Sequence, residues 1–145
     1  MSEDKPPHWR RLLVESLAAW IALILAEIVH GIVRALTLVP LVGEFRSDQI
    51  GVLTGSAIIF LIACWSVRRI GAASRREWIL VGAVWVVLTV AFEFAFGMLV
   101  LGLPLHEITV SYHIARGGFM PFGLAWMLFA PVMADRWRSR RREAG

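Results

Sequence analysis

Long runs of apolar residues dominate the chain, with polar residues gathered between them. The runs cover about 12–38, 50–67, 78–101 and 119–134. A helix needs about 20 residues to cross the apolar part of a bilayer, so the last run is short for a span. The pattern nevertheless predicts an all-α, polytopic membrane protein with four transmembrane helices, forming a single domain over residues 1–145.

Proline and glycine indicate where these helices end. Pro40, Gly43 and Pro104 are expected at helix ends, and Pro121 in the first turn of the fourth helix, where proline is tolerated. The connection over 103–118 fits two patterns, because its apolar residues alternate as in a strand and also share one face of a helix. An isolated strand at a membrane surface leaves its backbone unpaired. We therefore expect a short interfacial helix between helices three and four.

Composition and charge refine this interpretation. The chain is 58% hydrophobic and holds one cysteine, which excludes an internal disulfide. Twelve of its 15 basic residues fall on one side of the predicted membrane: in the N-terminal segment, in the connection after the second span and in a basic tail at 136–145. The positive-inside rule then places both termini in the cytoplasm. We attribute the high charge to topology and contact with the lipid bilayer, and expect no nucleic-acid partner.

Charged residues inside the apolar runs are the main functional signal. Glu27, His30 and Arg34 share one face of the first helix, and Glu93 lies in the third. Glu27 lies 15 residues after Leu12 and Glu93 15 residues after Trp78, so both carboxylates are expected at a similar depth in the outer half of the bilayer. Charges exposed to lipid are costly, which predicts that they face inward. We expect Arg34 to pair with a buried carboxylate, with Glu93 favoured over Glu27.

Further polar residues follow the first span and precede the fourth, at the same end. Together they predict a polar site open toward the outer face, above an apolar cytoplasmic half. The residues predicted to form the ligand or ion site are Glu27, His30, Arg34, Glu93, Glu44, Arg46, Gln49 and Arg116. Histidine changes charge closer to neutral pH than other side chains, so proton transfer is among the functions open to this site.

Metal or haem binding is an alternative. Glu27-x-x-His30 matches the Glu-x-x-His element of di-iron helix bundles. Those sites need two such elements and further carboxylates, and this chain has one element. Glu27, His30 and Glu93 are the candidate metal ligands, and His30 the candidate haem ligand; the sequence leaves the cofactor unknown. It contains no His-Glu-x-x-His, Gly-x-Ser-x-Gly or phosphate-binding glycine loop. This leans against an enzyme without deciding the question.

Gly51-x-x-x-Gly55 in the second span permits close approach of another helix. Packing within the chain and a subunit interface are both compatible with this motif.

Three stretches resemble a group of small, uncharacterised four-helix bacterial inner-membrane proteins. They are Glu27-x-x-His30-Gly31-x-x-Arg34, then Gly43-Glu44-x-Arg46-x-x-Gln49 through Ser56, then Phe92-Glu93 through Gly102 with Tyr112 and Gly117-Gly118. The resemblance implies a bacterial inner membrane location and a shared pattern of polar residues, but it brings no activity.

The sequence thus predicts a small transporter or channel component for an ion, a proton or a small polar solute. Four helices enclose little space, so a homo-oligomer or a larger membrane complex is expected. The alternatives are a non-catalytic accessory or assembly subunit, in which the buried charges are structural, and a metal- or haem-binding redox protein.

Overall fold

The structure is a computed structural model, and it describes residues 8–116 and 118–145, without the side chain of Arg116. This part of the chain is all-helical and contains no strand. Its elements are α1 (His8–Val42), α2 (Glu44–Ile70), α3 (Arg75–Leu99), α4 (Leu105–Val110), the 3₁₀ turn η1 (Ile114–Arg116) and α5 (Met120–Glu143).

Three of these helices, α1, α2 and α3, are long and apolar enough to cross a membrane. Only 17%, 28% and 22% of their most apolar stretches is buried within the protein, so most of that apolar surface needs lipid around it. Helix α5 does not meet the same measure. Its apolar part, predicted as the fourth span at 119–134, continues into an arginine-rich half that extends the helix to Glu143.

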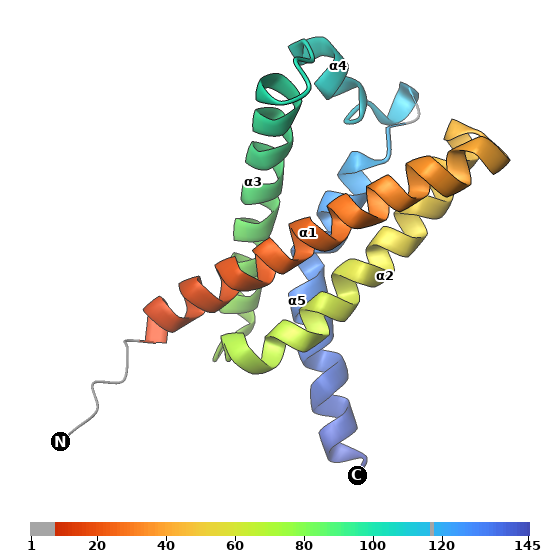
Figure 1. Cartoon of the computed structure of the whole chain (residues 1–145). Coiled ribbons are helices and arrows are strands. Elements are labelled where there is room, and N and C mark those ends of the chain that lie inside the picture. Colours follow the sequence, from red (N-terminus) through yellow and green to blue (C-terminus); the bar gives the residue numbers. More distant parts are fainter. Residues whose placement is uncertain (1–7, 117) are drawn as a thin grey trace.

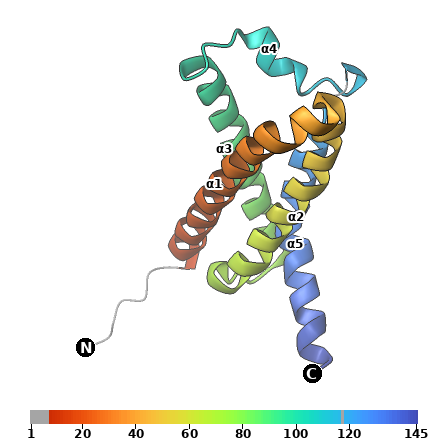
Figure 2. The same cartoon turned by 45° about the vertical axis from the view of Figure 1, so that its right-hand side comes forward.

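The helices pack as a series in which α1 contacts α2, α2 contacts α5, and α5 contacts α3. Helices α1 and α3 touch less and diverge toward the end that carries α4 (Figure 1). Helix α4 and the segment after it pass over this end of the molecule to reach α5, as both Figure 1 and Figure 2 show. The opposite end carries the start of α1, the connection between α2 and α3, and the C-terminus (Figure 1).

The observed helix ends agree with the ends predicted from glycine and proline at most positions and differ at Pro40. Gly43 separates α1 from α2 with a φ of 80°, which favours glycine, and Gly71 ends α2 at a φ of 60°. Pro121 lies in the first turn of α5, as predicted. The prediction that Pro40 ends a helix is wrong, because α1 continues to Val42. The break comes instead at Gly43, so the polar residues after it belong to α2 and not to a loop.

The connection over 103–118 contains a short helix, α4, which confirms the helical interpretation over the strand. Pro104 precedes it and its carbonyl accepts from the Glu107 amide. Ile108 is buried, because its side chain lies against Gly97 of α3, where a Cβ would sit 2.8 Å from Ile108 Cδ1. The connection is therefore packed onto α3.

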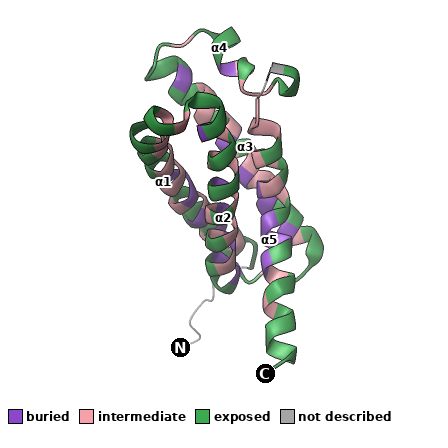
Figure 3. Ribbon diagram, turned by 90° about the vertical axis from the view of Figure 1, so that its right-hand side faces the viewer, coloured by how far each residue is buried: buried purple, intermediate pink, exposed green. Residues whose placement is uncertain are grey.

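The apolar core fills the half of the molecule near the α2–α3 connection. It consists of Ala19, Leu23, Ile59, Ala63, Val67, Ile70, Trp78, Val81, Trp85, Met127, Ala130, Val132 and Ala134. Trp85 is fully buried and its indole nitrogen donates to the Ser16 carbonyl at 3.0 Å. The outer surfaces of the long helices are mostly exposed and carry large apolar residues such as Leu36, Leu53 and Val87 (Figure 3). One half therefore contains an apolar core, and the polar side chains that lie between the helices are concentrated in the other half.

Candidate functional site

A cavity of about 880 Å³ lies above this core, between α1, α2, α3 and α5 and beside α4. Leu23, Ile59 and Met127 of the core line its apolar floor. Its ionisable lining residues are Glu27, His30, Arg34, Glu44, Asp48, Glu93 and Glu107. The fold thus brings the charged face of α1 together with Glu93 of α3 around one space. Helix α2 supplies further acidic groups.

Glu27 and His30 form a chain of contacts from α1 to α2. His30 Nδ1 lies 3.3 Å from Glu27 Oε2, and His30 Nε2 lies 2.7 Å from Thr54 Oγ1. The Thr54 hydroxyl also lies 2.9 Å from the Ile50 carbonyl. A hydroxyl has one hydrogen, so donating it to Ile50 requires His30 Nε2 to carry a proton. If the Thr54 hydroxyl instead donates to Nε2, a neutral imidazole can donate its Nδ1 hydrogen to Glu27, and both contacts are satisfied.

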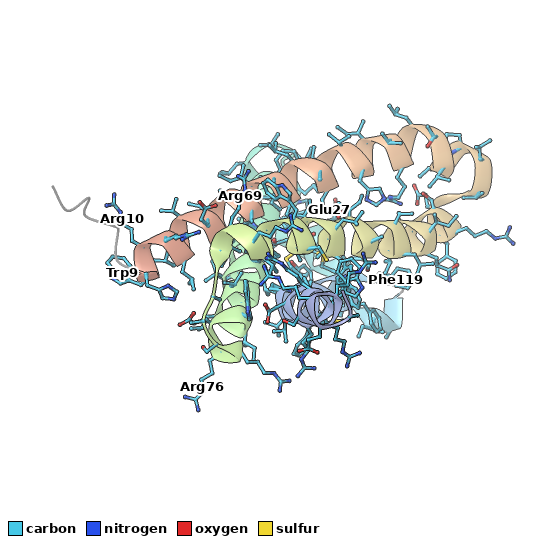
Figure 4. All side chains as sticks on the ribbon, turned by 90° about the horizontal axis from the view of Figure 1, so that it is seen from below. Trp9, Arg10, Glu27, Arg69, Arg76 and Phe119 are labelled. Atoms are coloured by element: carbon cyan, nitrogen blue, oxygen red, sulfur yellow. The ribbon has the colours of Figure 1, made fainter. Side chains whose placement is uncertain are left out.

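Glu27 also holds a buried oxygen that forms no hydrogen bond within the described residues, Oε1. A buried polar atom without a partner costs about 1–3 kcal/mol. In Figure 4, Glu27 lies on α1 beside α2. A Cβ on Gly55 of α2 would sit 3.2 Å from its Oε2 atom and 3.5 Å from Oε1. The carboxyl group is therefore packed against α2 at the edge of the cavity, with one oxygen left unpaired.

Arg34 pairs with a carboxylate of α2, and the prediction that it pairs with Glu93 or Glu27 is wrong. Its Nη1 atom donates to Ser47 Oγ at 3.2 Å and forms an ion pair with Asp48. The reason is the early start of α2, which places Asp48 on the face of that helix nearest Arg34. Glu93 is consequently free of this arginine.

Glu93 accepts a hydrogen bond from Tyr112, whose hydroxyl lies 2.6 Å from Glu93 Oε2. Both side chains are half-buried. Burial, followed by the hydrogen bond and the negative charge of Glu93, raises the pKa of Tyr112 well above its usual range. Tyr112 is therefore held as a hydrogen-bond donor. Among the described residues, no basic side chain forms an ion pair with Glu93.

The two glycines of the Gly51-x-x-x-Gly55 motif lie under the polar face of α1. A Cβ on Gly51 would sit 2.7 Å from Arg34 Cδ, and one on Gly55 would meet Glu27 and His30. The motif therefore serves packing within the chain. It makes room for charged side chains between two helices, whereas a close contact between their backbones was the expected use. A role at a subunit interface stays a prediction.

The other predicted site residues have different positions. Glu44 lines the cavity, whereas Arg46 and Gln49 do not. Asp48, Gly51, Val52 and Gly55 share the face of α2 that lines the cavity, and the helical period turns Arg46 and Gln49 away from it. Arg116 lies in η1, and its side chain is outside the described part of the structure.

The predicted ligand set omits several lining residues, including Asp48, Glu107 and Ser111, although Asp48 and Glu107 were expected among the polar residues at this end. The periodicity of α2 could have identified Asp48 had its helix been started at Glu44. Glu107 and Ser111 lie four residues apart, on or just after α4, which is the spacing of neighbours on a helix surface. No group of three or more His, Cys, Asp or Glu side chains in the described ranges is close enough to hold a metal ion.

Charge is unevenly distributed around the cavity. Its lining includes the carboxylates of Glu27, Glu44, Asp48, Glu93 and Glu107. Among the lining residues that the structure describes, Arg34 is the one arginine or lysine, and it is already paired with Asp48. The space therefore carries an excess of negative charge and suits a cation better than an anion.

Comparison with protein-family models, curated proteins and solved structures finds no match to this chain.

Proposed function

We propose that this chain is a small multi-pass protein of the bacterial inner membrane, with both termini in the cytoplasm, and that its cavity binds a small organic cation as part of a transporter or channel. The observation that carries the proposal is the charge of the lining, where the described side chains include five carboxylates and one arginine. In this account α5 forms the fourth span, and the cavity opens in the outer half of the membrane.

Electrostatics supports a cationic ligand. Carboxylates removed from bulk water are stabilised by a nearby positive charge. Among the described side chains, Asp48 pairs with Arg34 and Glu27 contacts His30. Glu93 has no basic partner among them and accepts a hydrogen bond from the neutral hydroxyl of Tyr112. Glu93 and the unpaired oxygen of Glu27 are therefore the groups that gain most from a bound ammonium group.

The size of the space favours an organic cation over a bare metal ion. Pockets for small organic molecules are about 300–1,000 Å³, and this cavity is about 880 Å³. The absence of a three-ligand metal group among the described residues agrees with this choice. The apolar core below closes the cavity toward the other end of the molecule. A pathway for transport would therefore run between copies of the chain, which makes a homo-oligomer part of the proposal.

A binding experiment on the purified full-length protein tests this function. Choline chloride is a suitable probe, with sodium chloride and sodium acetate at equal ionic strength as controls. A ligand at 100 times its Kd stabilises the folded protein by about 2.7 kcal/mol. We expect choline to raise the Tm above that in either sodium salt, and Glu93→Gln to remove most of the increase. Equal Tm values in all three salts, or a larger increase with acetate, would rule out a cation site.

A role as an accessory or assembly subunit is the second candidate, and one observation favours it. The ion pair of Arg34 with Asp48 joins α1 to α2, and the hydrogen bond of Tyr112 to Glu93 joins the connection to α3. Both would fasten a bundle without any ligand. In that case Glu93→Gln would lower the Tm equally in every salt, whereas the cation site predicts a loss specific to choline.

A further inference from the structure

A second cavity lies at the opposite end of the molecule, where the end of α2 meets the C-terminal half of α5. Its volume is about 580 Å³, and it is lined by Arg68, Trp137, Arg138, Arg141 and Arg142. Seen from below, side chains with nitrogen atoms gather where the two helices meet (Figure 4). Four arginines and one tryptophan therefore enclose a single space that is unrelated to the acidic cavity.

Helical spacing brings three of these arginines to one face. Arg138, Arg141 and Arg142 are related as i, i+3 and i+4 on α5, so their side chains are neighbours, and Arg68 of α2 faces them. Like charges at such spacings repel one another. None of the four arginines forms an ion pair with a carboxylate in the described part of the chain. The positive charge of the cluster is therefore not neutralised by an ion pair with any described carboxylate.

Arg138 is the most enclosed member of this basic pocket. It is half-buried, whereas Arg68, Arg141 and Arg142 are exposed. Burial, followed by the positive charges of Arg142 and Arg68, lowers the pKa of Arg138, and Asp135 offsets part of this effect. Favourable interaction with a helix C-terminus explains arginines in the last turn of a helix. It does not explain why arginines from two helices converge on one space.

The aromatic wall of the pocket indicates its position relative to lipid. The Arg141 guanidinium stacks over the Trp137 ring at 4.1 Å from the ring centroid, and Trp137 also packs against Phe60 with ring centroids 6.3 Å apart. Trp137 is 45% exposed, and Trp65 on the nearby turn of α2 is 50% exposed. Half-exposed tryptophans at the end of an apolar helix are typical of the membrane–water interface. The pocket therefore lies at the depth of lipid headgroups.

We propose that this basic pocket binds the phosphate group of an anionic phospholipid from the cytoplasmic leaflet. Arginine presents a planar fork of donors that matches phosphate oxygens, and several arginines around one phosphate give more donors than a surface charge can. Basic pockets between helices on the cytoplasmic side bind lipid headgroups in this way. The bound phosphate would join α2 to α5, whose arginine-rich half extends beyond the apolar part of the bundle.

Lipid binding to the full-length protein in nonionic detergent tests this proposal. Native mass spectrometry would compare short-chain phosphatidylglycerol, short-chain phosphatidylcholine and soluble glycerol 3-phosphate. The double variant Arg138→Gln with Arg142→Gln removes two lining arginines. The matched control Arg136→Gln with Arg140→Gln removes two exposed arginines of the same helix that do not line the pocket. Arg68→Gln tests the pocket from α2, should the first variant fail to fold.

We expect phosphatidylglycerol to bind at least tenfold more tightly than phosphatidylcholine. Glycerol 3-phosphate should bind far more weakly than phosphatidylglycerol. The Arg138/Arg142 variant and Arg68→Gln should lose most of this preference, while the control stays within twofold of wild type. Equal losses in the two double variants would show that total charge alone governs binding. No preference in the wild type, or binding of glycerol 3-phosphate as tight as phosphatidylglycerol, would also overturn the proposal.

Discussion

The choice of partner by Arg34 determines which carboxylates of the cavity are paired with a basic side chain. Arg34 is neutralised by Asp48, across the turn that joins α1 to α2. Glu93 on α3 is left with a tyrosine hydroxyl. The negative charge available to a ligand therefore depends on which carboxylate Arg34 selects.

Double-mutant cycles can identify that carboxylate. We predict a coupling of about 0.5–1.5 kcal/mol between Arg34→Gln and Asp48→Asn, in the lower part of the range for residues in contact. The value is modest because the two side chains are 27% and 46% exposed, which permits screening. Arg34→Gln and Glu93→Gln should be additive. Unfolding of the purified protein in mixed micelles measures both cycles, and coupling only to Glu93 would contradict the observed pair.

Tyr112 offers a second residue-scale prediction, because it is the single tyrosine of the chain. Its raised pKa means that absorbance titration should show ionisation well above the ordinary value of about 10. In Glu93→Gln the titration should move down toward that value, since the carboxylate raises the pKa, although burial still acts. A titration midpoint near 10 in the wild type would show that the contact with Glu93 does not form.

The same raised pKa fixes the direction of a stability change. The folded state holds the Tyr112 proton more tightly than the unfolded chain does. Its contribution to stability is therefore complete below about pH 10 and is lost as the pH rises from there through the folded-state pKa. Tyr112→Phe should remove this part of the alkaline destabilisation.

At the residue scale, the sequence predicted part of the cavity lining, and its role as a binding site stays a prediction. Glu27, His30, Arg34, Glu44 and Glu93 line the cavity, because charges in apolar helices turn away from lipid. The partner of Arg34 was not predictable in the same way. It depends on the point where α2 begins, and Gly43 rather than Pro40 determines that point.

At the scale of elements, the crossing of α3 and α5 depends on Gly82. A Cβ there would lie 2.1 Å from the Leu128 carbonyl oxygen, which is backbone and cannot move aside cheaply. The two helices therefore pack with their backbones close together, as small residues allow in membranes. Met127, which is next to Leu128 on α5, lines the cavity floor.

Substitution of Gly82 by alanine should therefore destabilise the bundle by about 1–3 kcal/mol or more, the usual cost of overpacking. Gly31→Ala is the matched control, because a Cβ there meets nothing within 4 Å. It should be neutral or stabilise by up to about 1 kcal/mol, since alanine favours a helix. Thermal melts of both variants in detergent measure the difference. A Gly82→Ala protein as stable as Gly31→Ala would show that α3 and α5 pack less closely.

The apolar periodicity predicted the long helices well, because length and hydropathy along one chain segment are enough to identify them. It could not identify Gly82 or the two roles of Gly51 and Gly55. Which helix a glycine faces depends on the order of packing, in which α5 lies between α2 and α3. That order of packing depends on contacts between segments far apart in the chain, which the local pattern of apolar residues does not show.

For the whole molecule, the two cavities lie at opposite ends and have opposite charge. The acidic one lies beside α4, and the basic one lies between the ends of α2 and α5. This polarity agrees with an orientation in which the arginine-rich end faces the cytoplasm. In that orientation His106, on α4, is outside and Ser139, near the end of α5, is inside.

Cysteine labelling tests this orientation in a Cys64→Ser background. We predict that an impermeant maleimide labels His106→Cys in intact cells, and labels Ser139→Cys only after the membrane is opened. Both residues are exposed, so access within the protein does not limit the reaction. Labelling of Ser139→Cys in intact cells would show that the orientation is reversed or that α5 does not cross the membrane.

We propose that the acidic cavity, through Glu93, binds the cation that an oligomer of this chain transports, and cation flux in proteoliposomes tests this proposal. Choline suits the measurement because its permanent charge keeps it from crossing lipid unaided. We predict saturable uptake of radiolabelled choline with the wild-type protein, loss of that uptake in Glu93→Gln, and retention in Glu143→Gln, which removes a carboxylate at the far end of α5. Uptake equal to that of empty liposomes, or unchanged in Glu93→Gln, would contradict the account.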